Sequence, residues 1–194
     1  MPHPPPLTFL FENPLVEAGR AYEYRHEGYW RDVGTIEDYW ASNMDLISPD
    51  PELVLDDSAW PILTLGVDRP PARISGTAGI VDALISPGCV IEGRVERSIL
   101  APGVVVEEGA TVRDSIVLHE TVISSGATVE CSIVDAEVSV GEGARIGEGY
   151  APETTGSKPS DSEIALVAKG ARIEEDARVA AGDRVEPGAT VEAS

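Results

Sequence analysis

The stretch that decides the fold lies at residues 100–112, which read LAPGVVVEEGATV. An aliphatic residue returns at every sixth position, at Leu100, Val106 and Val112, and the series continues to Leu118. An α-helix does not keep this period, whereas a short strand followed by a turn does. Four positions after each of these residues lies a second side chain that is expected to point inward: Val104, Ala110, Ile116 and Val122. The stretch therefore predicts a repeating unit of one short strand and one turn.

The hexad extends in both directions from this stretch. Upstream, Ile85 and Ile91 fit it, with Cys89 and Val95 as companions. Downstream, the frame slips by one residue twice and resumes at Ile123, Val129, Val134, Val140 and Ile146, with companions Ala127, Ile133 and Ala144. A last run is spaced by six without a break at Val167, Ile173, Val179, Val185 and Val191, with Ala171, Ala177 and Ala189 at the small position. Only Asp183 departs from this last pattern.

Hexads of this form stack as flat faces of a triangular solenoid, in which each coil buries its aliphatic residues against neighbouring coils. Roughly fifteen hexads predict about five coils. Residues 150–163 carry neither the period nor apolar content, so we expect an excursion from the solenoid there. We expect residues 151–161 to be dispensable for folding, because a loop closed on a rigid scaffold changes stability little with its length.

The first third of the chain has a different pattern. Ile36, Tyr39, Trp40 and Met44 would line one face of a helix that begins after Thr35. Asp38 lies three residues after Thr35, which gives a capping box, and Ser48-Pro49 would end the helix. Residues 20–24 alternate like a strand, and the prolines of residues 49–75 predict an extended connector.

Composition excludes several classes of partner. The chain has 194 residues and a formal charge of −20, which repels nucleic acid and anionic lipid alike. No apolar run approaches the roughly 20 residues that span a bilayer, and no basic segment precedes an apolar one at the start. We therefore expect a cytoplasmic protein. Only two of the basic residues are Lys; salt adaptation and codon usage both account for this, and the sequence does not separate them.

Two cysteines, Cys89 and Cys131, are too few for a disulfide framework or a four-ligand zinc site. Both lie among small and aliphatic residues. We expect buried free thiols.

Residues 29–36 read YWRDVGTI and are followed by Tyr39-Trp40, Ala41, Asn43 and Met44-Asp45-Leu46. This segment resembles the end of the catalytic domain of the glucose-1-phosphate adenylyltransferase (ADP-glucose pyrophosphorylase) family. The connector motifs Trp60-Pro61-Ile62 and Pro70-Pro71-Ala72-Arg73 are similar to the segment that precedes the C-terminal left-handed β-helix of that family. The resemblance covers roughly residues 15–150 and excludes the first eleven.

The resemblance implies a mainly β fold, a left-handed parallel β-helix preceded by a short α/β remnant of a nucleotidyltransferase domain. The implied division is an unmatched start at 1–11, the remnant at 12–48, a connector at 49–79 and the β-helix at 80–194, with the excursion at 150–163. Because the resemblance implies only part of a catalytic domain, we expect the solenoid to shelter part of the apolar face of the helix and to leave the rest exposed. The first third is then expected to be mobile or self-associated and open to proteases before residue 80.

The family joins ATP and glucose 1-phosphate to give ADP-glucose and pyrophosphate in glycogen synthesis. Its chemistry uses Mg²⁺ held by two carboxylates, and Asp32 matches one of them. The other carboxylate, the glycine-rich phosphate loop and the sugar-phosphate element belong to an N-terminal domain, and no matching glycine-rich string occurs in this chain. The resemblance implies a structural, oligomerising and potentially allosteric part, inactive alone, with a second copy or a separate nucleotidyltransferase domain as partner.

Several basic residues are candidates for phosphate or effector contact. Arg31 adjoins Asp32, while Arg69, Arg73, Lys158 and Lys169 are scattered through the chain. For each of them, a surface ion pair is the competing interpretation. Asp32 likewise has an alternative role as a turn residue before the helix.

His119 supports a second hypothesis, an independent hexapeptide-repeat acyltransferase in which a histidine deprotonates the acceptor. It is the only histidine within the repeats, so a zinc site of three histidines is excluded there. We expect His119 at an outward turn position. The aromatic residues Tyr29, Trp30, Tyr39 and Trp40 are interpreted as packing side chains rather than a base-stacking platform.

Overall fold

The computed structural model describes residues 18–20, 22, 24–55, 57–62, 68–151 and 157–193. The chain divides into two compact units, one up to Trp30 and one from Arg31 onward. The helix and the solenoid belong to the second unit. The expected boundaries after residues 48 and 79 stay a prediction.

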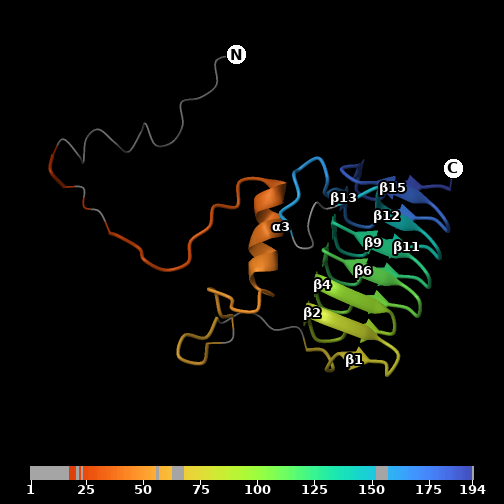
Figure 1. The fold of residues 1–194 in the computed structure, drawn as a ribbon, viewed down its shortest axis with the longest axis horizontal. Coiled ribbons are helices and arrows are strands. Elements are labelled where there is room, and N and C mark those ends of the chain that lie inside the picture. The colour runs from red at the N-terminus through yellow and green to blue at the C-terminus, as the bar shows by residue number, and fades with distance from the viewer. Residues whose placement is uncertain are drawn as a thin grey trace, which may run out of the picture. The chain divides into compact units, whose positions relative to one another are not determined.

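The second unit is a parallel β-solenoid accompanied by one helix, α3 (Ile36–Asp45) (Figure 1). One sheet has the strand order β1-β3-β5-β8-β11-β14-β17, which we call face A. Its strands are β1 (Arg73–Ile74), β3 (Val90–Ile91), β5 (Val105–Val106), β8 (Val122–Ile123), β11 (Ser139–Val140), β14 (Arg172–Ile173) and β17 (Thr190–Val191).

The second sheet bends into two faces at β4 (Arg94–Leu100), which pairs along its length with β2 (Gly79–Ile85). Face B comprises the first half of β4 with β6 (Thr111–Arg113), β9 (Thr128–Glu130), β12 (Arg145–Glu148) and β15 (Arg178–Ala180). Face C comprises the second half of β4 with β7 (Ile116–Val117), β10 (Ser132–Val134), β13 (Ala165–Val167) and β16 (Arg184–Val185). Three faces enclose one core, which confirms the fold expected for a hexapeptide-repeat left-handed β-helix.

The solenoid is longer than the expected five coils. Face A contributes one strand per coil, so its seven strands give six complete coils, and β17 begins a seventh. The difference arises at the N-terminal end, where β1 pairs with β3 and β2 pairs with β4. The solenoid therefore begins at Arg73, before the expected start at residue 80, within what we expected to be the connector.

The core confirms most of the hexad pattern. The inward residues of the central coils, among them Leu100, Val106 and Val112, are fully buried. The phase is different on face C, where Val117 points into the core while Ile116 and Ile133 lie on the outer side. Leu118 and Val122 are only partly buried. The inward expectation for Ile116, Leu118 and Ile133 was wrong, because face C carries an aliphatic row on its outer side as well, and periodicity does not distinguish the two rows. Val122 lies on β8 of face A, where the next residue, Ile123, is the fully buried one.

A short corner between faces B and C explains the slips in the hexad frame. Non-glycine residues adopt positive φ there, with Arg97 at 39°, Asp114 at 50° and Cys131 at 42°. Each is followed by a fully buried serine: Ser98, Ser115 and Ser132. The Ser115 amide donates to Ser98 Oγ and the Ser132 amide to Ser115 Oγ, both at 3.1 Å. This serine ladder satisfies backbone groups where the tight turn interrupts the strands, and its successive corners lie 17 residues apart.

Helix α3 begins at the expected place. Thr35 is its N-cap, and the Asp38 amide donates to Thr35 Oγ1 at 3.1 Å. The apolar face of the helix lies against the outer row of face C, where Trp40 is buried, whereas Ile36, Tyr39 and Met44 are only partly buried. Trp40 is only 3% exposed and packs in one cluster with Ile116 and Cys131. The solenoid wall thus covers part of this face, as expected, and leaves part of it accessible.

The predicted strand over residues 20–24 is not formed at the positions that the structure describes. Arg20, Tyr22 and Tyr24 lie outside any strand, and Ala21 and Glu23 fall outside the described residues. Both tyrosines are about nine-tenths exposed, at 90% and 89%, so no neighbouring strand covers them. The expected α/β remnant is therefore represented in the described residues by helix α3.

The excursion leaves the fifth coil after β12 and returns at β13. Pro159 within it is buried, and so is Ile164 directly after it. Residues 152–156 fall outside the described residues, and the dispensability of residues 151–161 for folding stays a prediction. Across the described part of the chain, no helix has the length and apolar character needed to cross a bilayer.

Candidate functional site

The candidate site is the loop that carries Asp32 and leads into helix α3. Asp32 is exposed, and its carboxylate folds back toward Gly34, where an added Cβ would lie 3.7 Å from Asp32 Oδ2. Thr35 then begins the helix. The position of Asp32 is thus set by how firmly the helix is attached to the solenoid.

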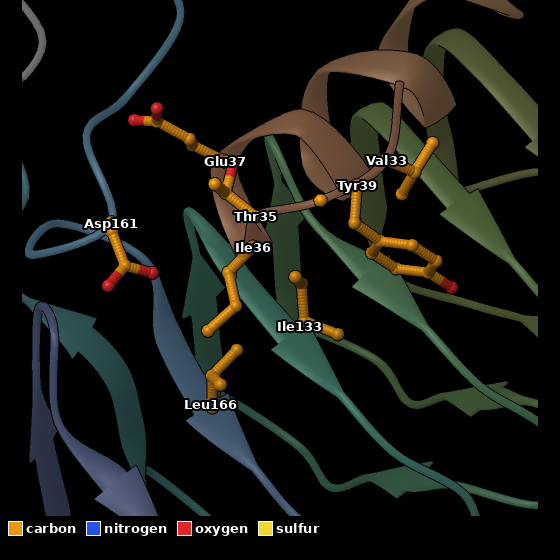
Figure 2. A pocket seen from close by; sticks show the side chains of 9 residues that line it. Val33, Thr35, Ile36, Glu37, Tyr39, Ile133, Asp161 and Leu166 are labelled. Carbon is orange, nitrogen blue, oxygen red and sulfur yellow. The ribbon is translucent and has the colours of Figure 1, made fainter. Parts of the chain in front are cut away.

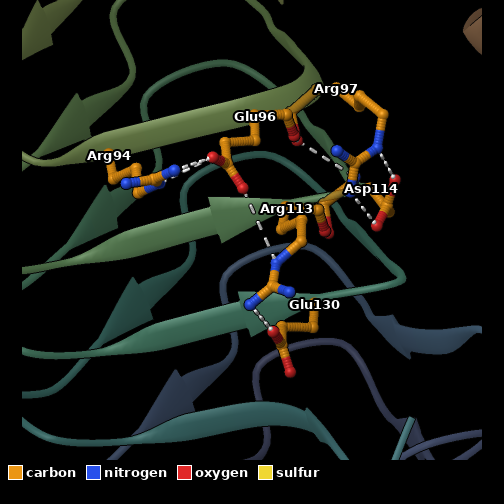
Figure 3. Close-up of polar contacts among 8 residues, drawn as sticks. Arg94, Glu96, Arg97, Arg113, Asp114 and Glu130 are labelled. Carbon is orange, nitrogen blue, oxygen red and sulfur yellow. Dashed lines mark hydrogen bonds and ion pairs between the residues drawn. The ribbon is translucent and has the colours of Figure 1, made fainter. Parts of the chain in front are cut away.

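Trp40 attaches the helix through a buried polar contact. Its indole Nε1 donates to the backbone carbonyl of Asp114 at 2.8 Å. The Asp114 carboxylate, itself buried, accepts from Arg97 Nε at 2.7 Å and from the terminal Arg97 nitrogen at 2.9 Å (Figure 3). The hydrogen bond from the guanidinium to Asp114 raises the pKa of Arg97 above its ordinary value. A bidentate pair of this kind fixes the corner residue to which the helix is bound.

A ladder of charges continues from this corner across face B (Figure 3). Glu96 accepts from Arg94 and also faces Arg113, which pairs with Glu130. The hydrogen bond from Arg94 lowers the pKa of Glu96. These arginines are already paired with carboxylates, which argues for a structural role.

Cys131 and Tyr150 lie beneath the helix. They share one apolar cluster with Trp40. Burial raises the pKa of Cys131 to about 12 and also raises the pKa of Tyr150. Cys89 is buried in the solenoid core, and burial raises the pKa of its thiol as well. Both cysteines are free and buried, as expected.

An open hollow of about 670 Å³ adjoins the Asp32 loop (Figure 2). One wall is the helix start from Val33 to Tyr39, and the floor is formed by Ile133 and Leu166 of face C. Asp161 from the excursion closes the far side. The lining is mostly apolar, so the hollow resembles a packing surface more than an ion site.

The residues that the structure describes do not complete a Mg²⁺ site. Among the described residues, no group of three or more His, Cys, Asp or Glu side chains could hold a metal ion. Asp32 can therefore offer one carboxylate, and the other ligands would have to come from outside the described part of the chain.

The predicted basic residues do not converge on one site. Arg31 pairs with Asp45 at 2.7 Å, and Arg69 pairs with Glu120 across Gly88 and Gly103. Arg73 lies on β1 beside a small hollow of about 170 Å³, with no ion-pair partner among the described residues. The ion-pair interpretation therefore fits Arg31 and Arg69.

The two lysines also form ion pairs. Lys158 pairs with Asp38 at 2.8 Å, and Lys169 pairs with Glu137 at 3.0 Å.

His119 lies exposed in the turn after β7, as expected. Its carbonyl accepts from the Glu137 amide at 2.9 Å, but its ring makes no hydrogen bond to a residue that the structure describes. A general base is normally oriented by a second group. The geometry thus lends the acyltransferase hypothesis no support beyond the presence of the histidine.

The sequence analysis did not identify Arg97 and Asp114 as the residues that hold helix α3 on the solenoid. The signal was a residue followed by serine at intervals of 17, in Arg97-Ser98, Asp114-Ser115 and Cys131-Ser132. That interval marks equivalent corners in successive coils.

Comparison with known proteins places these features in a family. The family described as GlmU-like, C-terminal hexapeptide matches residues 70–167. The glucose-1-phosphate adenylyltransferase of Acetivibrio thermocellus is 47% identical over 107 residues, covering 55% of this chain and 25% of the relative. The protein of the same name from Desulforamulus reducens is 44% identical over 105 residues, covering 54% and 26%. The glucose-1-phosphate adenylyltransferase of Bacillus thuringiensis is 44% identical over 104 residues, covering 54% of this chain and 28% of the relative.

The aligned region thus spans about a quarter of the length of these relatives. It corresponds to their C-terminal region.

Proposed function

The chain belongs to the GlmU-like C-terminal hexapeptide family, and from this membership we propose that it is the C-terminal β-helix part of a glucose-1-phosphate adenylyltransferase. The observation that supports this most directly is the 47% identity to a relative of that name. The complete reaction joins ATP and glucose 1-phosphate to give ADP-glucose and pyrophosphate.

In this proposal the chain acts only with a nucleotidyltransferase domain, supplied by a separate chain or by the rest of a longer protein. The relatives' additional length is compatible with such a partner. The solenoid holds helix α3, and the helix presents Asp32 at its N-terminal end. Bound Mg²⁺ would neutralise phosphate charge as pyrophosphate leaves, and Asp32 would supply one of its carboxylate ligands. Assembly into oligomers and regulation by an effector remain part of the proposal as secondary roles of the solenoid.

The test is reconstitution of ADP-glucose synthesis. The chain alone, given ATP, glucose 1-phosphate and Mg²⁺, should form no ADP-glucose above a blank. Adding the N-terminal three quarters of the Acetivibrio relative should restore product formation, measured against that part alone as a control. Turnover by the chain alone, or failure of the mixture when both parts are folded and bound to each other, would contradict the proposal.

The role of Asp32 is tested in the same mixture. Asp32→Asn removes a charge at constant size and should abolish most of the activity while binding of the two parts is unchanged. Asp50→Asn, which alters another exposed carboxylate beyond the other end of helix α3, is the matched control and should retain activity. Equal activity of the two variants would show that Asp32 is a turn residue only.

A further inference from the structure

The second half of the excursion is anchored to the solenoid, although it lies outside the coils. Pro159 and Ile164 are buried, and Asp161 accepts from Arg184 of β16 at 3.2 Å. Between them, the Ser160 amide donates to Glu163 Oε2 at 2.8 Å, which closes a tight turn. The segment therefore presents the side chain before Pro159 from a fixed base.

That side chain is Lys158, and it reaches the first turn of helix α3. Its Nζ lies 2.8 Å from Asp38 Oδ1 and 3.9 Å from Glu37 Oε1. The other oxygen of the same carboxylate, Asp38 Oδ2, accepts from Thr35 Oγ1 at 2.8 Å. Asp38 thus joins the ammonium group of the excursion to the N-cap of the helix. The hydrogen bond from Lys158 is the main cause that lowers the pKa of Asp38.

The N-cap is only three residues from Asp32, and the intervening Val33 and Gly34 line the hollow (Figure 2). Asp161 of the excursion lies on the opposite side of that hollow. A contact that fixes Thr35 therefore also fixes the end of the Asp32 loop.

We propose that Lys158 is a positioning residue for the Asp32 loop, acting through Asp38 and the Thr35 cap. The excursion is then the part of the solenoid that sets the geometry of the loop. That Lys158 positions the Asp32 loop is inferred from the contacts alone. The consequence of this positioning for ADP-glucose synthesis rests on the proposed function.

The contact can be removed without unfolding the protein. The Lys158 side chain is 44% exposed and that of Asp38 30%, and exposed ion pairs change local equilibria by a factor of about two to five. The solenoid core contains neither residue. The Lys169–Glu137 pair, with side-chain exposures of 56% and 54%, offers a matched contact on another turn of the same chain. These are also the only two lysines of the sequence.

The first experiment measures amide hydrogen exchange by NMR in the full chain. The Asp38 amide, which donates to Thr35 Oγ1, reports the helix cap, and the Glu137 amide, which donates to the His119 carbonyl, reports the control turn. Lys158→Met should speed exchange at Asp38 by about two- to fivefold and leave Glu137 unchanged. Lys158→Arg should restore the original rate, and Lys169→Met should not affect Asp38. Unchanged exchange at Asp38 in Lys158→Met, or an equal change in Lys169→Met, would overturn the proposal.

The second experiment uses the reconstituted mixture with the N-terminal part. Lys158→Met should raise the Mg²⁺ concentration needed for half-maximal activity, whereas Lys158→Arg and Lys169→Met should match the unaltered chain. An unchanged Mg²⁺ requirement alongside faster exchange would overturn the catalytic consequence only. If the unaltered chain gives no product, the proposed function fails, and the exchange data still decide whether Lys158 positions the loop.

Discussion

Trp40 shows how one side chain fixes the relation between helix and solenoid. Its ring fills the space above Ile116 and Cys131, and its indole nitrogen satisfies the carbonyl of Asp114. Leaving a buried carbonyl without a hydrogen-bond donor lowers the free energy of unfolding by about 1–3 kcal/mol. The aromatic residue thus contributes both apolar burial and a specific polar contact.

We therefore expect Trp40→Phe to lower the free energy of unfolding by about 1–3 kcal/mol, measured by urea denaturation. Phe keeps most of the apolar area but cannot donate to Asp114. The control is Trp60→Phe, because Trp60 is 84% exposed and should change stability by less than about 0.5 kcal/mol. Equal effects of the two changes would argue against the indole contact.

Because of the Cys131 thiol, we expect the free energy of unfolding to decrease at alkaline pH. Its pKa is raised from 9.0 to about 12 in the folded chain, so the folded state holds the neutral thiol while the unfolded state begins to ionise. Stability should be fully present below about pH 9 and should fall as the pH rises toward 12.

Urea midpoints measured across this interval test the effect. Cys131→Ala should flatten the decline, since it removes the titrating group. A decline of the same slope in the variant would assign the effect to other groups. Alkylation of the native thiol at pH 8 should likewise be slow and become fast only in urea.

At this scale the sequence predicted the local contacts and missed the distant ones. The Thr35 cap and its partner Asp38 are three residues apart, so their chemistry is visible in the sequence, and both were correctly predicted. The contact between Trp40 and Asp114 spans 74 residues. It depends on how a coil corner meets a helix, which no local pattern encodes.

Among the elements, helix α3 and the outer row of face C depend on each other. Ile116 and Ile133 face away from the core and are covered by the helix, which has its own apolar residues on that side. Neither surface would be stable in water without the other. The structure thus explains why the hexad pattern on face C seemed to have two inward residues.

Limited proteolysis should distinguish this arrangement from a detached helix. The connector exposes Leu53, Val54 and Leu55, so cleavage is expected between residues 50 and 62, while residues 36–45 resist. After one cut, the fragment that contains α3 should co-elute with the solenoid in native gel filtration and separate from it only in denaturant. Separation under native conditions would show that the contact with face C is too weak to hold the helix.

Periodicity predicted the coils well because every inward residue meets its equivalent in the next coil. It failed where a corner shortens the repeat by one residue, as at Asp114 and Cys131, and at the N-terminal coil. There β1 is only two residues long and is recognised by its pairing with β3, not by its own composition.

For the whole molecule, the dominant electrostatic feature is the net charge of −20. Arginines such as Arg94 and Arg113 are used in ion pairs, so the excess carboxylates are not balanced elsewhere. Mutual repulsion of these charges opposes the compact state.

Added salt should therefore stabilise the protein despite weakening its exposed ion pairs. Raising NaCl from about 0.01 M to about 1 M shortens the Debye length from about 30 Å to about 3 Å, which screens the repulsion. Tm measured by circular dichroism should rise over this range, and an uncharged solute at equal osmolality should raise it less. A fall in Tm would mean that the ion pairs outweigh the repulsion.

The way the helix lies across the coils also has a mechanical consequence. A solenoid whose coils touch only their neighbours would unravel under tension one coil at a time, and each 17-residue coil would release about 60 Å of chain. Helix α3 contacts residues from β7, β10 and β13, and so acts as a clasp over three successive coils. Pulling from the C-terminal end would detach β17 and the sixth coil with little resistance, and the force would then climb when the clasped coils have to part together.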